Sequence, residues 1–343
     1  MKTSTFDQSR PEVVKAVGLM SGGLDSALAV KILMNIGVDV TGVTFVMPWG
    51  DREPRGVQAL ARQLGIPLKI FMLEEDYLAM LQHPCYGYGV AFNPCLDCHL
   101  FMMKKASQYM RDIGAEFLFT GEVLGQRPMS QRRKCLDILE KAAGLEGRLL
   151  RPLSARLLTP TIPEQEGRID RGRLLGLSGR GRHDQFALAK QWGITSFSPP
   201  GGGCLLTEVP FGHKMKDFLQ FGFRDYREAA ILRWGRYFRL SPDFVAVLGR
   251  DEHENDQILK SGHPEDLMMI LSGDRPGPLL VLKGTSPSPF ILSLAAGLVQ
   301  HYSKYKDEAP LSVDYACLSR QADTGSVISA RLEEQQIRQW RIG

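Results

Sequence analysis

Short apolar runs and amphipathic segments alternate through the first 120 residues. Buried strands are predicted at four apolar runs, residues 13–20, 38–46, 67–72 and 116–120. Helices are predicted where apolar side chains recur at helical spacing, at residues 27–33, 57–64 and 100–113. This alternation is typical of an α/β fold with a doubly wound parallel sheet. Ligands bind beyond the carboxyl ends of such strands, where Ser21 and Thr120 both fall.

The pattern changes in the second half of the chain. Two further helices are predicted at residues 184–193 and 214–221. Beyond residue 225, short strands are predicted at residues 237–240, 244–248, 267–271 and 279–283. A chain of 343 residues favours more than one domain. We therefore predict an α/β domain at residues 1–224 and a smaller α+β domain at residues 225–343.

Composition narrows the class of protein. Hydrophobic residues make up 43% and charged residues 23%, as in soluble globular proteins. The first twenty residues lack the apolar core of a secretory signal, and the apolar stretch 291–299 is too short to span a bilayer. We therefore expect a cytoplasmic protein without a membrane segment. Its six cysteines are then reduced thiols, metal ligands or catalytic groups rather than a disulfide framework.

The net positive charge of the chain is small, but basic residues are concentrated in one stretch. The net charge of +4 is compatible with nucleic-acid binding without demonstrating it. Residues 151–182 contain seven arginines and only three acidic residues. A solvated basic loop and a surface for a phosphate backbone both explain this bias.

Residues 21–26, Ser-Gly-Gly-Leu-Asp-Ser, lie between the first predicted strand and the first predicted helix. Free backbone N–H groups at a helix start attract anions, and Gly22 and Gly23 let an anion approach closely. Ser21 and Ser26 add hydroxyl donors, whereas Asp25 indicates a shared Mg²⁺. The segment lacks the Gly-Lys-Ser/Thr of the ATP-binding P-loop. It resembles the pyrophosphatase loop of enzymes that cleave ATP between the α and β phosphates; the alternative is an ordinary glycine turn.

Three of the cysteines stand out by their settings. Cys95 and Cys98 form a CxxC at a predicted helix start, and Cys204 ends a glycine-rich loop. Such thiols act as a redox pair, as metal or cluster ligands, as persulfide carriers, or only as buried hydrophobes. Zinc would need a fourth ligand, for which His99 is available. Three cysteines would leave one iron of a [4Fe–4S] cluster open to sulfide, so we favour a cluster over a persulfide and both over zinc.

Together these motifs resemble a known family. The segment from Cys95 through Lys105, followed by Thr-Gly-Glu-Val-Leu-Gly-Gln at residues 120–126, is similar to tRNA 4-thiouridine synthetases. Asn93-Pro94-Cys95 and the loop cysteine are also similar to tRNA 2-thiouridine synthetases. The resemblance covers residues 14–215. It departs from the family in leaving no room for an N-terminal RNA-binding domain before residue 21 and in the basic insert at residues 151–182.

The C-terminal region carries a second resemblance. Residues 249–256, followed by Asp266-Leu267 and Pro276-Gly277-Pro278, are similar to the RNA-binding domain of NFACT proteins. The resemblance implies that this part docks tRNA, and the alternative is a neutral α+β partner domain.

The family resemblance implies an ATP-dependent tRNA sulfurtransferase that most simply makes 4-thiouridine. It implies ATP, Mg²⁺ and a [4Fe–4S] cluster as cofactors, with tRNA and sulfide or a cysteine-desulfurase-type donor as partners. The implied catalytic residues are Asp25, Cys95, Cys98 and Cys204, and the three cysteines are the implied cluster ligands. The implied nucleotide-binding residues are Ser21, Gly22, Gly23, Asp25, Ser26, Phe45, Gly121 and Gln126.

Other functions remain open on the sequence alone. The alternatives are a persulfide-based 2-thiouridine synthetase, an amide-forming ATP enzyme, an RNA-binding protein with a vestigial ATP site, and a cluster enzyme that removes sulfur without ATP.

Overall fold

The computed structural model describes residues 13–50, 53–128, 130–198, 204–222, 225–273, 275–319 and 324–343. Its first half contains a five-stranded parallel sheet with the order β3-β2-β1-β4-β5. The strands are β1 (Lys15–Leu19), β2 (Asp39–Val46), β3 (Leu68–Met72), β4 (Phe117–Thr120) and β5 (Leu149–Leu150). This doubly wound order confirms the predicted fold class. The strand order reverses between β1 and β4, which is where such sheets bind ligands.

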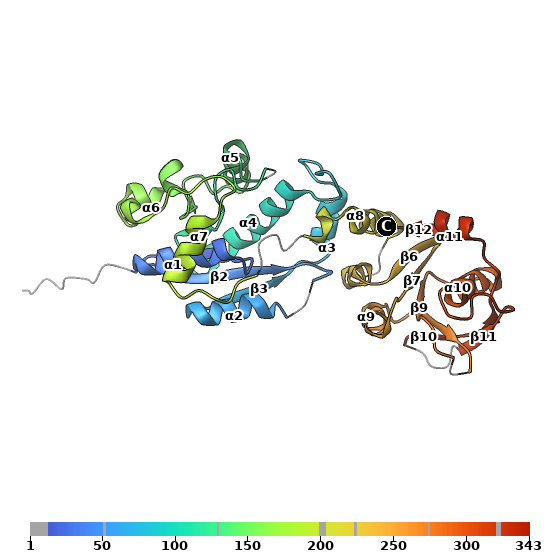
Figure 1. The fold of residues 1–343 in the computed structure, drawn as a ribbon. Coiled ribbons are helices and arrows are strands. Elements are labelled where there is room, and N and C mark those ends of the chain that lie inside the picture. Colours follow the sequence, from blue (N-terminus) through green and yellow to red (C-terminus); the bar gives the residue numbers. More distant parts are fainter. Residues whose placement is uncertain are drawn as a thin grey trace, which may run out of the picture.

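Helices cover both faces of this sheet (Figure 1). One face packs on α1 (Leu24–Asn35), α2 (Arg55–Leu64) and α7 (His183–Gln191). The other face packs on α4 (Cys95–Asp112) and α5 (Arg133–Ala142). Successive residues of β1 point to opposite faces, since Ala16 belongs to the first core and Val17 to the second. Both faces are therefore buried, as a parallel sheet requires.

The chain between the two sheets is mostly short helices. In order they include η1 (Ala155–Leu157), α6 (Ile162–Gln165), η2 (Arg171–Arg173), η3 (Leu205–Thr207), α8 (Val209–Phe221) and η4 (Tyr226–Arg233). Helix α3 (Glu75–Gln82) lies earlier, between β3 and α4. The predicted boundary between residues 224 and 225 adjoins residues 223–224, which lie outside the described residues, and it stays a prediction.

The second half forms a seven-stranded antiparallel sheet with the order β11-β10-β8-β9-β7-β6-β12. Its strands are β6 (Arg236–Ser241), β7 (Phe244–Leu248), β8 (Leu267–Leu271), β9 (Leu280–Lys283), β10 (Ser312–Cys317), β11 (Thr324–Ile328) and β12 (Arg341–Ile342). Helix α10 (Pro289–His301) and the short α11 (Glu334–Trp340) pack on one face, and α9 (Glu252–Ser261) packs on the other. Among the described residues, every helix is too short or too polar to cross a membrane.

One hydrophobic cluster joins the two halves. Trp49, Tyr77 and Phe211 from the first half share it with Val245 and Val281 from the second sheet. Figure 1 shows α8 and α3 beside the second sheet. The two sheets are therefore connected by a continuous apolar core as well as by the chain.

Two predicted helices begin earlier in the structure than expected. The helix expected at residues 100–113 begins at Cys95, and the one expected at residues 214–221 begins at Val209. Pro94 precedes the first turn of α4, and Pro210 lies within the first turn of α8. A proline is tolerated there because the first helical N–H groups have no intrahelical partner. The CxxC therefore occupies the first turn of α4, as predicted.

Candidate functional site

The segment at residues 21–26, called here the phosphate-type loop, leaves the carboxyl end of β1 and leads directly into α1. Gly22 has a φ of 78°, and a Cβ there would lie 2.9 Å from Val57 Cγ2. Gly23 is the N-cap of α1 and carries no side-chain cap. Ser26 Oγ donates to the Gly23 carbonyl oxygen at 2.7 Å, so this hydroxyl holds the turn together. The first N–H groups of α1 lie beyond the end of β1 without a side-chain partner, which is the expected arrangement for binding an anion.

Asp25 lies between two side chains from distant segments. Gln126 Nε2 donates to Asp25 Oδ2 at 2.8 Å, and Arg182 Nη2 lies 3.6 Å from Asp25 Oδ1. Gln185 Nε2 donates in turn to Gln126 Oε1 at 3.2 Å. Asp25 Oδ1 and Arg182 Nε are both buried and have no hydrogen-bond partner among the described residues. Because unpaired buried polar atoms are costly, this carboxylate oxygen and guanidinium N–H are suited to a cation and an anion bound at the same place.

Gly121 brings the end of β4 against the same loop. A Cβ at this position would lie 2.5 Å from Asp25 C and from Ser26 N. The absence of a side chain therefore allows the two backbones to touch. This contact sets the relative position of the segments that follow β1 and β4.

The segment before Cys204 is tied to the phosphate-type loop. Ser198 N donates to the Gly22 carbonyl oxygen at 2.8 Å, and Ser198 pairs with Gly23 in an isolated β-bridge. Residues 199–203, which include the three glycines, lie outside the described residues, whereas Cys204 is described. The chain therefore carries Cys204 only a few residues from a backbone contact with Gly22 and Gly23.

The three cysteines approach one another, each in a different environment. Asn93 Nδ2 donates to Cys95 Sγ at 3.2 Å, and the Tyr77 hydroxyl is hydrogen-bonded to Cys98 Sγ at 3.2 Å. The Cys204 side chain is exposed, and the charges of Cys204 and Cys95 both raise the pKa of Cys98. The three thiols are therefore within electrostatic range of one another, and their joint role stays a prediction.

Burial controls the protonation of these groups. Loss of solvent raises the pKa of Cys98 to about 12, only partly offset by the Tyr77 hydrogen bond. The same cause raises the pKa of Cys204 and places the pKa of Tyr77 well above its ordinary value. Cys98 is therefore a thiol at neutral pH, whereas nucleophiles and metal ligands are thiolates.

The predicted metal site is not preformed among the described side chains. Within the described ranges, no three His, Cys, Asp or Glu side chains are grouped closely enough to hold a metal ion. Cys95, Cys98 and Cys204 lie near one another without forming a preformed ligand cage. A [4Fe–4S] cluster on them stays a prediction.

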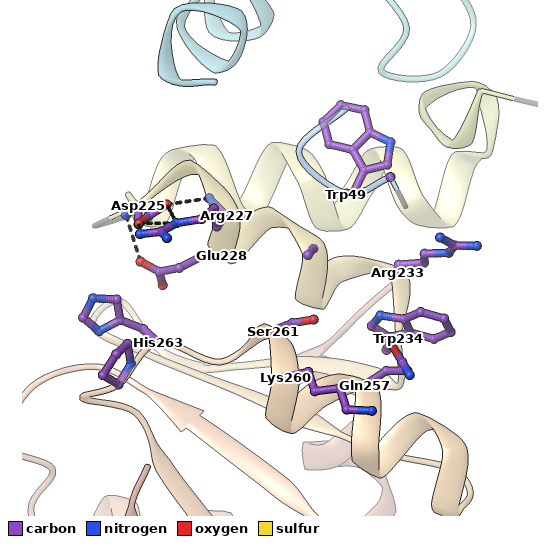
Figure 2. A pocket seen from close by; sticks show the side chains of 13 residues that line it. Trp49, Asp225, Arg227, Glu228, Arg233, Trp234, Gln257, Lys260, Ser261 and His263 are labelled. Carbon is purple, nitrogen blue, oxygen red and sulfur yellow. Dashed lines mark hydrogen bonds and ion pairs between the residues drawn. The ribbon is translucent and has the colours of Figure 1, made fainter. Parts of the chain in front are cut away.

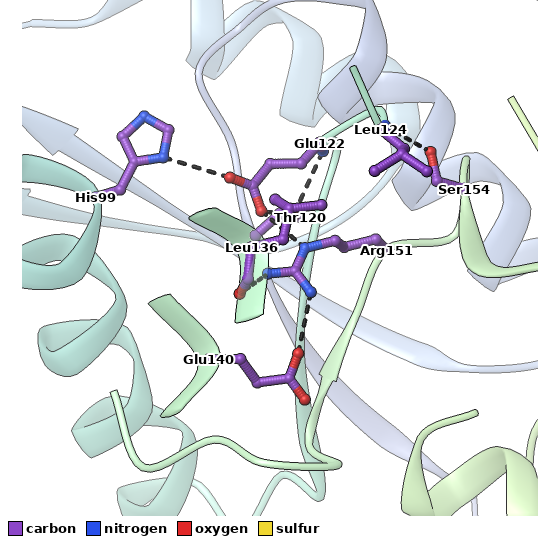
Figure 3. Close-up of polar contacts among 8 residues, drawn as sticks. All are labelled: His99, Thr120, Glu122, Leu124, Leu136, Glu140, Arg151 and Ser154. Carbon is purple, nitrogen blue, oxygen red and sulfur yellow. Dashed lines mark hydrogen bonds and ion pairs between the residues drawn. The ribbon is translucent and has the colours of Figure 1, made fainter. Parts of the chain in front are cut away.

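Behind the cysteines, Glu122 anchors a buried polar network (Figure 3). Its carboxylate lies 3.3 Å from His99 Nδ1 and accepts from Thr120 Oγ1 and from Arg151 Nε, each at 3.0 Å. Arg151 also donates to Glu140 at 3.1 Å. Burial alone would raise the pKa of Glu122, but the His99 hydrogen bond and the charge of Arg151 outweigh it and lower the pKa to about 2. The network fixes α4 to the end of β4.

Several neighbours of the site were not predicted from the sequence. Arg182 belongs to the basic stretch 151–182, but nothing in its spacing marks it as the partner of Asp25. Tyr77 and Gln185 lie in ordinary helical contexts and acquire their contacts only through the fold. Phe45 stacks on Phe71 with 5.5 Å between the ring centroids, so its predicted nucleotide contact stays a prediction.

Two protein families match separate parts of this chain. Residues 13–156 match the family described as thiamine biosynthesis protein (ThiI). Residues 235–341 match the family described as NFACT protein RNA binding domain. The chain joins a ThiI-like domain to an NFACT RNA-binding-like domain. The ThiI-like domain contains the phosphate-type loop, the CxxC and the Glu122 network, whereas Cys204 lies outside both matched ranges.

Curated relatives match part of the chain. The tRNA-specific 2-thiouridylase MnmA of Syntrophotalea carbinolica is 38% identical over 114 residues, which are 30% of this chain and 32% of the relative. MnmA of a Roseiflexus species is 27% identical over 209 residues, 55% of this chain and 56% of the relative. The matches thus span from about a third to just over half of these relatives.

Two solved structures are similar to part of the chain. A 4-thiouridine synthetase in complex with RNA and ATP is 22% identical, with a TM-score of 0.40 over 57% of this chain and 45% of that one. The U34-tRNA thiolase NcsA from Methanococcus maripaludis with its [4Fe-4S] cluster is 17% identical, with a TM-score of 0.32 over 57% of this chain and 64% of that one.

Proposed function

We propose that this protein is an ATP-dependent tRNA sulfurtransferase. The observation that carries the proposal is the junction of an anion-binding loop, an unsatisfied carboxylate at Asp25 and three neighbouring cysteines at one end of a doubly wound sheet. The match to the ThiI family and the likeness to tRNA-specific 2-thiouridylases support it. The NFACT-type match supports tRNA as the substrate.

In the proposed activation step, the loop at residues 21–26 holds the β and γ phosphates of ATP. Asp25 would hold a Mg²⁺ that offsets phosphate charge, and Arg182 would neutralise more of that charge. A uridine carbonyl oxygen attacks the α-phosphorus as the bond to the β-phosphate oxygen breaks, and pyrophosphate leaves. The carbonyl oxygen thereby becomes part of AMP, a good leaving group. Gly121 and Gln126 border the space for the nucleotide or the target base.

In the proposed transfer step, a sulfur nucleophile replaces AMP at the activated carbon. With sulfide, the C–S bond forms, the C–O bond to AMP breaks, and the sulfide gives up its protons to solvent. With a persulfide on Cys204, the terminal sulfur attacks the activated carbon and AMP leaves. Attack of a second cysteine thiolate on Cys204 Sγ then releases the thiolated base and leaves a disulfide, which a dithiol reduces. Because Cys204 is exposed, its thiolate can take the outer sulfur from the persulfide of a cysteine-desulfurase-type donor, whose own cysteine leaves as a thiolate.

Two products remain candidates, for different reasons. The ThiI match, with the Cys95 and Thr120 segments, favours 4-thiouridine. The curated 2-thiouridylase relatives favour 2-thiouridine as the second candidate. Nucleoside analysis of tRNA after reaction separates them, because the two thiolated uridines differ in mass-spectrometric fragmentation and in ultraviolet absorption.

The test of the proposed function is thiolation of tRNA by the purified protein with ATP, Mg²⁺ and sulfide. Asp25→Ala should abolish thiolation while tRNA binding persists. Asp39→Ala, at the opposite end of the sheet, is the matched control and should keep activity. Cys204→Ala should stop sulfur transfer but leave AMP–tRNA formation intact, and Cys135→Ala should change neither. Full thiolation by the Asp25 variant would refute the role of the loop.

The proposed cluster is tested separately by iron and acid-labile sulfide analysis after anaerobic purification. On the order of four irons per chain, lost in the Cys95, Cys98 and Cys204 alanine variants, would establish a three-cysteine cluster. If the protein thiolates tRNA without containing iron, the cluster is excluded and the persulfide route is favoured.

A further inference from the structure

A cavity of about 530 Å³ lies where the two halves of the molecule meet (Figure 2). Asp225 and Glu228 line it, and both are ion-paired, with Arg227 and Lys283 respectively. The Trp49 side chain at its wall is only 4% exposed. A polyanion such as tRNA is better placed on a surface whose cations are exposed and unpaired.

The arginines of the basic stretch 151–182 differ in whether the fold already uses their charge. Five of them bind carboxylates or backbone carbonyl oxygens of the same domain: Arg151, Arg156, Arg168, Arg171 and Arg173. Arg182 lies beside Asp25 in the candidate site. Arg180 is exposed, and among the described residues no side chain or carbonyl oxygen pairs with it. Most of this charge therefore holds the fold together, and Arg180 is left for a ligand.

The turn before α5 presents two more arginines. Gly125 N donates to the Gln131 carbonyl oxygen at 2.7 Å, and Gln131 N donates to the Arg127 carbonyl oxygen at 3.0 Å, so the turn is closed on itself. Gln131 is buried, whereas Arg127 and Arg132 are exposed. In the part of the chain that the structure describes, neither arginine has a hydrogen-bond or ion-pair partner. A backbone fixed in this way presents both guanidinium groups to solvent.

The turn and the end of the basic stretch lie side by side. Leu124 pairs with Ser178 in an isolated parallel bridge, and Gly179 N donates to the Leu124 carbonyl oxygen at 2.8 Å. Arg127 and Arg180 follow closely on the two sides of this bridge. Because paired parallel segments run in the same direction, both arginines belong to one edge of the domain. We call the exposed arginines of this edge the basic rim: Arg127, Arg132 and Arg180.

The basic rim borders the candidate site. Gln126, which directly precedes Arg127, donates to Asp25 Oδ2 at 2.8 Å. The other segment reaches the same carboxylate through Arg182, at 3.6 Å. Burial raises the pKa of Cys204, and the charge of Arg127 acts against that rise, so Arg127 is also within electrostatic range of this thiol. An anion on the rim would therefore lie beside both the phosphate-type loop and Cys204.

The charge of this edge stays positive when its acidic residues are counted. The exposed carboxylates in the helices that follow the two segments are Asp137, one helical turn after Lys134, and Asp184, which lies 3.6 Å from His183 Nδ1. The three rim arginines and Lys134 outnumber these two carboxylates. Helices α5 and α7, which begin at this edge (Figure 1), both lack a side-chain cap, so their first N–H groups add partial positive charge.

We propose that the basic rim binds the phosphates of tRNA that flank the target uridine. The proposal rests on the proposed function, because it takes tRNA as the substrate. A guanidinium group matches the geometry of phosphate oxygens, and phosphate contacts fix the position of a nucleic acid rather than its sequence. The rim would give the ThiI-like domain its own hold on tRNA, separate from the NFACT RNA-binding-like domain. It would hold the uridine between Asp25 and Cys204.

The first test is the salt dependence of tRNA binding by the full chain. Arg127→Gln, Arg132→Gln and Arg180→Gln should each reduce the slope of log K against log salt by about one, and the triple variant by about three. Arg127→Lys keeps the charge and should keep the slope. The matched control is Arg62→Gln, an exposed arginine in the last turn of α2, which lies at the amino end of the sheet; it should bind tRNA as the wild type does.

Two further measurements identify which phosphates occupy the rim. The triple variant should raise KM for tRNA and leave KM for ATP unchanged, because the phosphates belong to tRNA. Ethylation of single tRNA phosphates removes their charge. Ethyl groups beside the thiolated uridine should block binding to the wild type, a result that does not depend on a folded variant, and should have no further effect on the triple variant.

Four results would overturn the proposal. If the wild type thiolates tRNA and the rim variants keep its salt dependence, the rim has no part in tRNA binding and the proposed function stands. If KM rises for ATP and not for tRNA, the rim holds the nucleotide. If the blocking phosphates lie far from the thiolated uridine, the rim does not border the target. If the wild type neither binds nor thiolates tRNA, the proposed function falls, and the assignment of the rim falls with it.

Discussion

Glu122 shows how a single buried side chain makes the stability of the fold depend on pH in the acid range. Its pKa is lowered from 4.5 to about 2, so the folded state holds the carboxylate charged at a pH where the unfolded chain binds a proton. The stability that this provides is complete above pH 4.5 and is lost as the pH falls toward 2. Glu122→Gln should therefore destabilise the protein at pH 7 by up to roughly 3 kcal/mol.

Denaturant unfolding from pH 7 to pH 2 measures this effect. The difference between the wild type and Glu122→Gln should shrink steadily below pH 4.5, the ordinary value for a glutamate. Glu308→Gln, on an exposed glutamate, is the control and should run parallel to the wild type. A constant difference at every pH would mean that Glu122 acts through packing rather than charge.

At the scale of residues, the sequence predicts those motifs whose residues are contiguous in the chain. The loop at residues 21–26 and the CxxC are contiguous, and each carries its own turn or helix start, so their positions follow from local spacing. The partners of these groups come from segments far apart in the chain. Arg182 reaches Asp25 across 157 positions of sequence, and Tyr77 reaches Cys98 only because α3 packs on α4. No local pattern encodes such pairings.

At the scale of elements, the contact between Gly121 and the loop after β1 is decisive. Gly121→Ala would place a Cβ 2.5 Å from backbone atoms of Asp25 and Ser26, so one of the two segments must shift. A displacement of this size at an active centre costs roughly a hundredfold in rate. We expect ATP turnover to fall by about that factor, as measured by pyrophosphate release.

A second glycine gives the control for that change. Gly56 lies in the first turn of α2, and a Cβ there meets nothing within 4 Å. Gly56→Ala should therefore keep full turnover and raise the stability slightly, because alanine favours a helix. Unchanged turnover in Gly121→Ala would show that the loop tolerates movement.

Two of the helices that the sequence failed to predict lack an amphipathic period. Residues 252–261 form α9 with only Ile258 buried, so their pattern is almost entirely polar. Residues 289–301 form α10 and are buried on most sides, so their apolar run has no polar face. Strands β1 to β4 of the first sheet were predicted closely because helices cover both faces of that sheet and each strand is one apolar run. Strand β5 has only two residues, too few for such a run, and was not predicted.

At the scale of the whole molecule, one buried lysine ties the connecting segment to the second sheet. Lys283 Nζ in β9 lies 2.6 Å from Glu228 in η4 and 2.6 Å from Asp266. Lys283→Met removes the cation from two buried carboxylates and should lower the free energy of unfolding by about 3–5 kcal/mol. Thermal and urea unfolding measure it, with the exposed Lys306→Met as the control. A Lys283→Met protein with wild-type stability would show that other contacts hold η4 in place.

The hydrophobic cluster that joins Trp49 and Phe211 to Val245 and Val281 has a consequence for how this protein can be divided. A cut near residue 224 would expose apolar surface on both fragments, and each would tend to aggregate or to bind the other. Neither half is then a module that can be exchanged between proteins by joining chains at a linker. Recombination with another RNA-binding domain would have to carry over the matching surface of α3 and α8 as well.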